Sequence, residues 1–347
     1  LFGDRMYIAN ATGCSSIWGN SSPSTPYTVN EKGQGPAWSN SLFEDNAEFG
    51  YGMLLAQKAI RGGLKAKVED VMNSEKAPEE VKAACKEYLD TFDCGATNGT
   101  ATEKLVEAIK DADCDVCRDI VKNKDFLAKK SQWIFGGDGW AYDIGFGGVD
   151  HVLASGRDIN VMVFDTEVYS NTGGQSSKST PTGAIAQFAA GGKETKKKDM
   201  ASIAMSYGYV YVAQISMGAD FNQTVKAIAE AEAYPGPSLI IAYAPCINHG
   251  IKKGMAKAQT EEELAVKCGY WHNFRFNPAA DKKFALDSKT PDMENYMDFL
   301  NGEVRYNSLK RANPAKAERL FGKNEQEAKD RYTYLNKLVK LYGAEEE

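Results

Sequence analysis

The chain has 347 residues, 43% of them hydrophobic and 25% charged, and its formal net charge is −6. This composition is typical of a folded globular protein with enough apolar residues for one large α/β domain or two smaller ones. Because the charge is negative and no basic face is concentrated in the sequence, we expect no nucleic-acid partner.

No apolar run approaches the roughly 20 residues that a membrane helix needs, and the opening segment lacks the basic and apolar regions of a secretory signal. The sequence therefore predicts a cytoplasmic protein without a membrane partner. It begins at Leu1 rather than at a methionine, and from this we expect it to be a piece of a longer protein.

The first part of the chain predicts a strand at residues 6–10, quoted "MYIAN", and then a Gly/Ser/Pro-rich loop at residues 13–41. Loops of that length are usually functional or disordered, and Trp18, Tyr27 and Trp38 within this one favour ordered packing. Residues from about 46 to 123 are charged and helical in pattern, as expected for a helical insertion that lies outside a sheet.

From residue 131 onward, short apolar strands alternate with helical stretches. The middle strands are apolar almost throughout, as in parallel strands that are covered on both faces. This series predicts an α/β fold with a doubly wound, mostly parallel sheet. The predicted strands are residues 131–135, 159–165, 209–215 and 238–245, and the predicted helices between them are residues 141–156, 199–208 and 220–234.

We expect two domains. Residues 1–277 would form the α/β domain, and residues 278–347 a charged helical tail without strand signals, which wraps around the protein or a partner subunit. The lysine-rich segment at residues 193–199, "KETKKKD", is more typical of a solvated loop than of a binding patch.

The stretch "GGDGW" at residues 136–140 comes directly after a predicted strand. Asp138 would therefore lie at the carboxyl edge of the sheet, where ligands collect in open α/β folds, and Thr166 and Val168 follow the next strand along the chain. Carboxylate, hydroxyl and carbonyl oxygens are the ligands that Mg²⁺ takes together with phosphate oxygens and water. The two loops thus predict a magnesium and phosphate site.

The glycines on either side of Asp138, Gly137 and Gly139, would let backbone N–H groups approach those phosphates. The alternative is structural, because glycine, asparagine and aspartate are also ordinary turn residues and the two loops could be tight turns.

These residues resemble the thiamine-diphosphate motif, in which Gly-Asp-Gly around Asp138 is followed 28 positions later by Thr166 and then by Val168. The Asn-Asn pair that usually ends the motif is replaced by Asp165-Thr166, and this departure, with "EVYSNTGGQ", resembles the 2-oxoacid:ferredoxin oxidoreductases. The strings "ATGCSSIWG" and "APCINHG" narrow the resemblance to the pyruvate:ferredoxin (flavodoxin) oxidoreductase family.

The resemblance runs from Met6 to about Pro278 and implies the C-terminal, thiamine-diphosphate-binding part of such an enzyme. It implies that Asp138, Thr166 and the carbonyl of Val168 hold Mg²⁺ on the diphosphate. The residues implied around the cofactor are Gly137, Asp138, Gly139, Trp140, Thr166, Glu167, Val168, Tyr169, Ser170, Asn171 and, after the first predicted strand, Cys14. We expect the side-chain amide of Asn171 to be the catalytic group that touches the substrate.

The family's activity, as the resemblance implies it, is the decarboxylation of pyruvate by thiamine diphosphate in anaerobic metabolism. Electrons pass through [4Fe–4S] clusters to ferredoxin or flavodoxin, and coenzyme A takes the acetyl group. We expect a homodimer in which N-terminal domains of the same enzyme supply the glutamate that activates the cofactor. This chain alone is therefore expected to be inactive.

The resemblance also sorts the seven cysteines. Cys14 and Cys246 each follow a predicted strand, and they would supply two of the four thiolates of a [4Fe–4S] cluster, with the other two upstream of Leu1. We expect Cys114 and Cys117 to be surface thiols of the helical insertion. The cysteines expected to be small buried residues are Cys85, Cys94 and Cys268.

Three other interpretations stay open. The chain could belong to another 2-oxoacid:ferredoxin oxidoreductase or to a thiamine-dependent decarboxylase, and the absence of iron–sulfur absorption in the full-length protein would favour the decarboxylase. A non-enzymatic, Mg²⁺-dependent phosphate-binding module would use the same loops but would leave Cys14 and Cys246 without a role.

Overall fold

The computed structural model describes residues 1–13, 15–16 and 27–343. The chain divides into two compact units. The first comprises Leu1–Ile8, Tyr27–Ala37 and Gly50–Gln132, and the second comprises Ala9–Pro26, Trp38–Phe49 and Trp133–Glu347. The boundaries expected from the sequence, at residues 277 and 278, remain a prediction.

The first unit is mainly helical, as expected for residues of about 46 to 123. Its helices are α2 (Asn46–Asn73), α3 (Glu79–Asp90), α4 (Asn98–Ile109) and α5 (Asp115–Lys122). They enclose an apolar core of fully buried side chains that includes Val68, Tyr88, Leu105 and Ile120. Burial of these residues is the main stabilising contribution in this unit.

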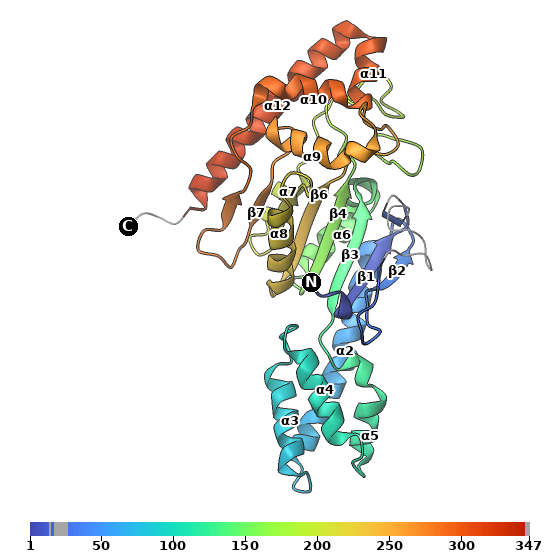
Figure 1. Cartoon of the computed structure of the whole chain (residues 1–347), viewed down its shortest axis with the longest axis vertical. Coiled ribbons are helices and arrows are strands. Elements are labelled where there is room, and N and C mark those ends of the chain that lie inside the picture. The colour runs from blue at the N-terminus through green and yellow to red at the C-terminus, as the bar shows by residue number, and fades with distance from the viewer. Residues whose placement is uncertain (14, 17–26, 344–347) are drawn as a thin grey trace. The chain divides into compact units, whose positions relative to one another are not determined.

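An eight-stranded sheet, most of whose residues belong to the second unit, has the order β2-β1-β3-β4-β6-β5-β7-β8 (Figure 1). The strands are β1 (Met6–Ala11), β2 (Ala37–Ser41), β3 (Ser131–Gly137), β4 (Ile159–Asp165), β5 (Tyr211–Ile215), β6 (Pro237–Tyr243), β7 (Phe274–Phe276) and β8 (Phe284–Leu286). Strand β4 is parallel to β3 and β6, and β5 is parallel to β6. The α/β fold with a mostly parallel sheet is therefore confirmed.

The sequence missed two strands. β2 lies inside the segment expected to be a loop, and β8 lies in the tail expected to have no strand. Three of the five residues of β2 are polar and none is fully buried, and β8 has only three residues, paired antiparallel with β7. Neither segment is long enough or apolar enough for its periodicity to stand out from a loop.

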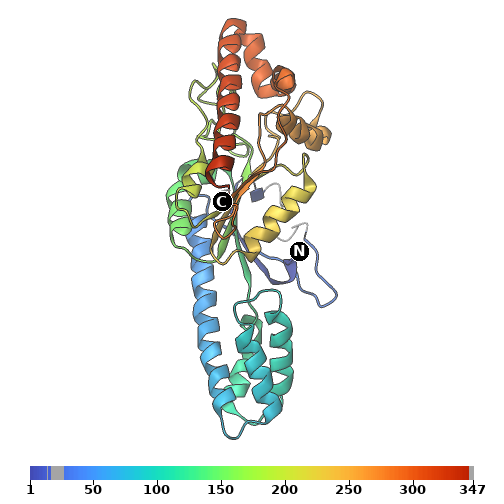
Figure 2. The same ribbon diagram turned by 90° about the vertical axis from the view of Figure 1, so that its left-hand side faces the viewer.

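Helices cover the sheet, and the chain after β8 is helical as expected. The helices of the second unit are α6 (Phe146–Ala154), α7 (Met200–Met205), α8 (Phe221–Ala233), α9 (Ala258–Lys267), α10 (Tyr296–Gly302), α11 (Val304–Ala312) and α12 (Pro314–Leu341), with a π-helix at Gly139–Ile144 and short 3-10 turns at Met255–Lys257 and Met293–Asn295. The first unit has two further 3-10 turns, at Gly3–Arg5 and Lys124–Phe126. Figure 2 shows α12 as one long, straight helix beside the sheet. No described helix is both long and apolar enough to cross a bilayer.

Candidate functional site

The predicted site lies where β3 and β4 end. These strands are parallel neighbours, with Gly137 opposite Phe164, so the residues that follow them meet at one edge of the sheet. Asp138 is the first residue after β3 and is fully buried. Thr166 is the first residue after β4.

The three oxygen atoms predicted to bind Mg²⁺ are close together. The hydroxyl oxygen of Thr166 lies 2.9 Å from Oδ1 of Asp138 and 3.0 Å from the carbonyl oxygen of Val168. Neighbouring ligands of an octahedral Mg²⁺, which binds at 2.0–2.1 Å, are about 2.9 Å apart. Both distances from the Thr166 hydroxyl therefore fit neighbouring positions of a magnesium coordination shell.

Two further groups fix the Asp138 carboxylate. The backbone N–H of Thr166 donates to Oδ1 at 3.2 Å, and the hydroxyl of Ser177 donates to Oδ2 at 2.7 Å. Ser177 was not predicted from the sequence, because nothing local to it distinguishes it from other loop serines. It leaves Oδ1 as the carboxylate oxygen that faces Thr166.

The electrostatics favour a cation at this carboxylate. Burial, and then the nearby negative charge of Asp165, raise the pKa of Asp138 from 3.8 to about 7, although hydrogen bonds from Ser177 and Thr166 act in the opposite direction. A divalent cation would offset both effects and hold the group ionised. Within the described ranges, no group of three or more His, Cys, Asp or Glu side chains could hold a metal, so a cation here depends on hydroxyl and carbonyl oxygens as well.

Glycines around Asp138 are required by close packing. A Cβ atom on Gly139 would lie 2.5 Å from the ring of Tyr169, and one on Gly136 or Gly145 would lie 2.2 or 2.3 Å from the ring of Trp140. Trp140 is fully buried between these two glycines, and its Nε1 has no hydrogen-bond partner in the described part of the chain. The glycines thus fix two aromatic rings beside the carboxylate.

The helix expected at residues 141–156 begins irregularly. Residues Gly139–Ile144 form a π-helix in which the N–H of Gly145 donates to the carbonyl of Trp140 at 2.8 Å, and the α-helical part starts only at Phe146. Short π-helical segments often mark functional sites. The sequence predicted the helix but could not predict the wider turn at its start.

The loop after β4 closes on itself. The N–H of Tyr169 donates to the carbonyl of Gln175 at 2.9 Å, and the N–H of Gly174 donates to the carbonyl of Tyr169 at 2.8 Å. Ser170 lies within the loop, with its hydroxyl 3.5 Å from that of Thr166. Asn171 is exposed at the loop's tip, where its amide is accessible, and its catalytic role remains a prediction.

The side chain of Glu167 points into a buried ion network that sequence reasoning missed. Its Oε1 pairs with Lys197 at 2.9 Å and its Oε2 with Arg305 at 3.3 Å. Lys197 also pairs with Asp165 at 2.8 Å, and Arg305 with Glu303 at 3.2 Å. The carboxylate of Glu167 is therefore occupied, and its main-chain N–H and carbonyl are bonded to Asp165 and Thr180 at 3.1 and 2.7 Å.

The segment expected to be a solvated loop, residues 193–199, is in fact partly buried, and that expectation was wrong. Lys193 donates to the carbonyls of Ser177 and Thr180 at 2.9 and 2.5 Å, and Lys198 donates to the carbonyl of Tyr142 at 3.1 Å. A run of lysines carries no sequence signal for which of them have carboxylate or carbonyl partners far away in the chain.

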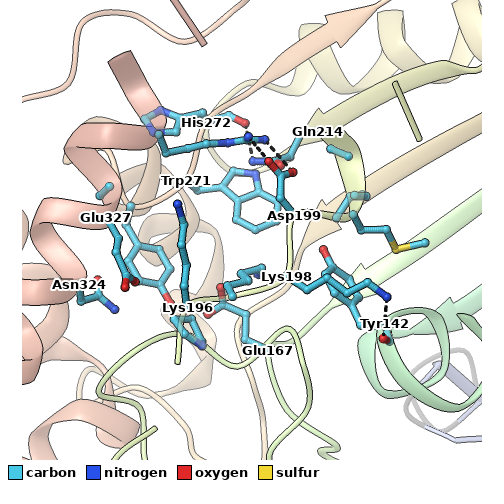
Figure 3. A pocket seen from close by; sticks show the side chains of 18 of the residues that line it. Tyr142, Glu167, Lys196, Lys198, Asp199, Gln214, Trp271, His272, Asn324 and Glu327 are labelled. Carbon is cyan, nitrogen blue, oxygen red and sulfur yellow. Dashed lines mark hydrogen bonds and ion pairs between the residues drawn. The ribbon is translucent and has the colours of Figure 1, made fainter. Parts of the chain in front are cut away.

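A cavity of about 130 Å³ is lined by Glu167, Lys197, Trp271, His272 and residues of α12 (Figure 3). The charges around it are largely paired with one another, and Figure 3 shows Lys198 bonded to Tyr142 and Asp199 bonded to an arginine. Asp138 does not line this cavity. We therefore do not assign the cofactor to it.

Cys246, after β6, is next to the predicted magnesium loop. It is 1% exposed and packs in a small apolar cluster with Val168 and Ala186. Burial raises the pKa of its thiol, while the positive charge of Arg305 and the backbone N–H groups of Asn248 and His249 lower it. Hydrogen bonds of this kind to sulfur help to set the potential of an iron–sulfur cluster. Cys14, its predicted partner, lies outside the described residues.

The other cysteines met the expectations only in part. Cys85 and Cys268 are buried as expected, but Cys94 is exposed. Cys117 is not the surface thiol expected, because it is 4% exposed in the apolar core of the helical unit, where Cys114 accepts a hydrogen bond from its backbone N–H at 3.3 Å. The charged residues around this pair on the chain concealed the buried face of α5.

Comparisons with known proteins agree with this geometry. Residues 123–242 match the family described as thiamine pyrophosphate enzyme, C-terminal TPP binding domain. Thiamine pyrophosphate is another name for thiamine diphosphate. The match includes β3, β4 and the two loops that bring Asp138, Thr166 and Val168 together.

The chain is similar along nearly all its length to a segment of much longer proteins. It is 58% identical to pyruvate-flavodoxin oxidoreductase of Enterobacter agglomerans, over 98% of the chain and 30% of that protein. It is 56% identical to pyruvate:ferredoxin oxidoreductase of Moorella thermoacetica, over 98% of the chain and 30% of that protein. The chain thus spans about a third of the length of these relatives.

A solved structure of 2-oxoglutarate:ferredoxin oxidoreductase from Magnetococcus marinus superimposes with a TM-score of 0.39 and 13% identity, over 73% of this chain and 59% of that one. This likeness is too weak to add to the assignment. The identities to the two longer proteins are sufficient without it, and on them the chain belongs to the pyruvate:ferredoxin (flavodoxin) oxidoreductase family and contains that family's thiamine-pyrophosphate-binding region.

Proposed function

We propose that this chain holds thiamine diphosphate through a Mg²⁺ ion bound by the Asp138 carboxylate, the Thr166 hydroxyl and the Val168 carbonyl. The observation that carries the proposal is the convergence of these three oxygens, at 2.9 and 3.0 Å, at the carboxyl edge of two parallel strands. The residues fit the group, because a fully buried carboxylate with a raised pKa needs a compensating positive charge.

The other predicted residues would surround the cofactor. Backbone N–H groups of Gly137 and Gly139 would face the diphosphate at the start of the π-helix, where a helix end attracts negative charge. The rings of Trp140 and Tyr169 lie beside Asp138, and close contacts with the neighbouring glycines hold the two rings in place. Ser170 and Asn171 complete the loop, and the exposed amide of Asn171 would touch the substrate.

Thiamine diphosphate, when bound, supplies the carbanion chemistry that allows a 2-oxoacid to lose CO₂. This chain's part is to bind the diphosphate, to hold the cofactor's orientation through the magnesium, and to exclude water. Its buried aromatic rings suit that last task, since Trp140 is fully buried.

We further propose that Cys246 is a ligand of a [4Fe–4S] cluster next to the cofactor. Its contact with Val168 places the sulfur beside the proposed magnesium loop. Together with Cys14, it would supply two of the four thiolates that such a cluster needs, and the other two would come from outside this chain.

For the whole enzyme we propose the oxidative decarboxylation of pyruvate to acetyl-coenzyme A in the cytoplasm, with ferredoxin or flavodoxin as electron acceptor. The named relatives are pyruvate oxidoreductases of this kind, and each is about three times as long as the chain. We propose a homodimer in which N-terminal domains of the same enzyme contribute the cofactor-activating glutamate and the main pyruvate contacts. On this view the chain alone is inactive.

The experiment that tests the cofactor site is calorimetric titration of the full-length protein with thiamine diphosphate plus Mg²⁺ and with ATP plus Mg²⁺. We expect magnesium-dependent binding of thiamine diphosphate only. Preferential binding of ATP would instead support a general phosphate-binding module.

The cluster is tested by substituting Cys246→Ser in the full-length protein under anaerobic conditions. We expect a loss of iron and of iron–sulfur absorption, while Cys268→Ser, a matched change at another buried cysteine, leaves both unchanged. A wild-type protein without iron–sulfur absorption would favour a thiamine-dependent decarboxylase, and a preference for another 2-oxoacid over pyruvate would favour a different member of the 2-oxoacid oxidoreductases.

A further inference from the structure

We propose that Arg305 and Lys197 are positioning residues, which hold Glu167 in a strained conformation and so preset the loop that binds the cation. The inference rests on the proposed magnesium site. It gives a role to two cations that neither the cofactor motif nor the sequence pattern assigns, one of them from the helical segment after residue 278.

The strained residue stands between the two proposed ligands of the loop. Glu167 has a φ of 63°, which residues with a Cβ atom rarely adopt. Its left-handed turn brings the hydroxyl of Thr166 and the carbonyl of Val168 to the same side of the chain, 3.0 Å apart. If Glu167 relaxed to an ordinary extended or helical conformation, the Val168 carbonyl would move away from the Thr166 hydroxyl, which itself lies 2.9 Å from the Asp138 carboxylate.

The side chain of Glu167 is held at both carboxylate oxygens. Lys197 pairs with Oε1 at 2.9 Å, and Arg305 pairs with Oε2 at 3.3 Å. Tyr270 donates a hydrogen bond to Oε2 at 2.5 Å. Because Glu167 and Arg305 are 2% and 1% exposed, solvent screens this ion pair little.

The peptide group between Thr166 and Glu167 is held by the same network. Arg305 donates to the carbonyl of Thr166 at 3.2 Å, and Asp165 accepts from the N–H of Glu167 at 3.1 Å. Lys197 is bonded to Asp165 at 2.8 Å as well as to Glu167. Each cation therefore constrains both the side chain and the main chain of the loop.

The origin of Arg305 gives the helical tail a function. Arg305 lies in α11, and the N–H of Ile185 bonds to its carbonyl at 3.1 Å, which fixes α11 against the loop region. Burying this many ions is a poor way to gain stability, since desolvation offsets the attraction between them. Their convergence on one strained residue is instead what a site that needs precise geometry requires.

The test compares Glu167→Ala with Glu167→Gly in the full-length protein. Both changes remove the same carboxylate, but glycine adopts a positive φ without strain and alanine does not. Mg²⁺ is titrated by calorimetry in the presence of thiamine diphosphate. We expect the alanine variant to bind Mg²⁺ about tenfold more weakly than the glycine variant, and both to bind more weakly than the wild type.

A second pair of variants keeps the proposal testable if Glu167→Ala does not fold. Arg275 forms a comparable ion cluster away from the site, with Glu230 at 2.7 Å and Asp287 at 2.9 Å. We expect Arg305→Lys to weaken Mg²⁺ binding about tenfold, because lysine cannot reach two partners as a planar guanidinium does, and Arg275→Lys to leave it unchanged. We expect both substitutions to shift the temperature of thermal unfolding.

The outcomes separate the two proposals. No magnesium-dependent binding of thiamine diphosphate by the wild type would overturn the proposed function. Wild-type binding with equal Mg²⁺ affinities of the alanine and glycine variants would overturn the positioning role alone, as would equal effects of Arg305→Lys and Arg275→Lys on Mg²⁺ affinity.

Discussion

The helical unit and the carboxyl edge of the sheet bury different kinds of residue. In the helical unit the core is apolar, and ion pairs such as Lys32 with Glu103, whose side chains are 61% and 60% exposed, lie at the surface. At the carboxyl edge three carboxylates, Asp138, Asp165 and Glu167, are at most 2% exposed. The first arrangement stabilises a fold, whereas the second lowers stability unless cations compensate the charge.

The difference indicates what each region is selected for. The one buried cation of the helical core, Arg61, donates to the carbonyls of Leu127 and Phe92 at 3.0 and 2.8 Å and needs no carboxylate. At the edge, the fully buried Asp138 carboxylate is instead bonded to the N–H and hydroxyl of Thr166 and to the hydroxyl of Ser177. A region of this kind is expected to be completed by an external cation, and the following substitutions test that contrast.

Replacing Asp138 by asparagine should have the largest effect. The substitution keeps the size and the hydrogen-bonding oxygen of the side chain but removes its charge, so we expect Mg²⁺ affinity in the presence of thiamine diphosphate to fall at least about 100-fold. Calorimetry on the full-length protein measures it. Retention of wild-type affinity by this variant would show that the buried carboxylate is structural.

In the helical unit, Leu105→Ala should lower stability and leave Mg²⁺ affinity unchanged, which is the opposite of the effect expected for Asp138→Asn. It leaves a cavity in a dry apolar core, for which we expect a loss of about 2–5 kcal/mol in the free energy of unfolding of this unit. Faster hydrogen exchange of the amides of α4 would report this loss, with Mg²⁺ affinity unchanged. A change in cofactor binding of the size expected for Asp138→Asn would contradict the separation of roles.

Gly139→Ala should have an intermediate effect, because its Cβ would meet the ring of Tyr169 at 2.5 Å. Relieving such an overlap usually costs about 1–3 kcal/mol, so we expect Mg²⁺ affinity about tenfold lower and a lower thermal transition. Gly147→Ala is the matched control, since nothing lies within 4 Å of its Cβ in α6. If both variants lost affinity equally, the Tyr169 contact would not be the cause.

The pH dependence should be the smallest effect. Burial raises the pKa of Asp138 from 3.8 to about 7, so the cation-free folded protein holds a proton that the unfolded chain releases. Its contribution to stability is therefore present at low pH and is lost as the pH rises from about 4 to about 7. The raised pKa of Glu303, also about 7 and due mainly to burial, acts in the same direction.

Bound Mg²⁺ should reverse this loss at Asp138, because it holds the carboxylate ionised. We expect the increase in thermal stability on adding Mg²⁺ and thiamine diphosphate to be larger at about pH 8 than at about pH 6, with affinity changing at most tenfold per pH unit. Thermal scans at both pH values measure it. In Asp138→Asn the difference between the two pH values should disappear.

The sequence alone predicted the parallel strands well. Residues 159–165 form β4 with the expected bounds, because a fully buried parallel strand is an unbroken run of β-branched and apolar residues. The proximity of Asp138 to Thr166 and Val168 was likewise predictable, because Asp138 follows β3 and the other two residues follow its neighbour β4. A local sequence pattern can therefore indicate regular strands and their order along the chain.

The support of the site was not predictable in the same way. The positive φ of Glu167 depends on tertiary contacts, because nothing in "DTEVY" disfavours an ordinary turn. Arg305 lies 138 residues from its partner Glu167 along the chain, and single-sequence periodicity carries no information on such pairs. The fixed dihedral and the long-range ion pairs arise only when the fold is complete.

The short strand β8 has a consequence for the handling of this protein. It pairs on one side with β7 and is the last strand of the sheet, and α12 packs against it. An unprotected sheet edge is a template on which other chains can add strands and aggregate. Shortened versions of the chain that lack α12 would expose that edge, so their failure to stay in solution would reflect strand addition rather than a loss of the fold.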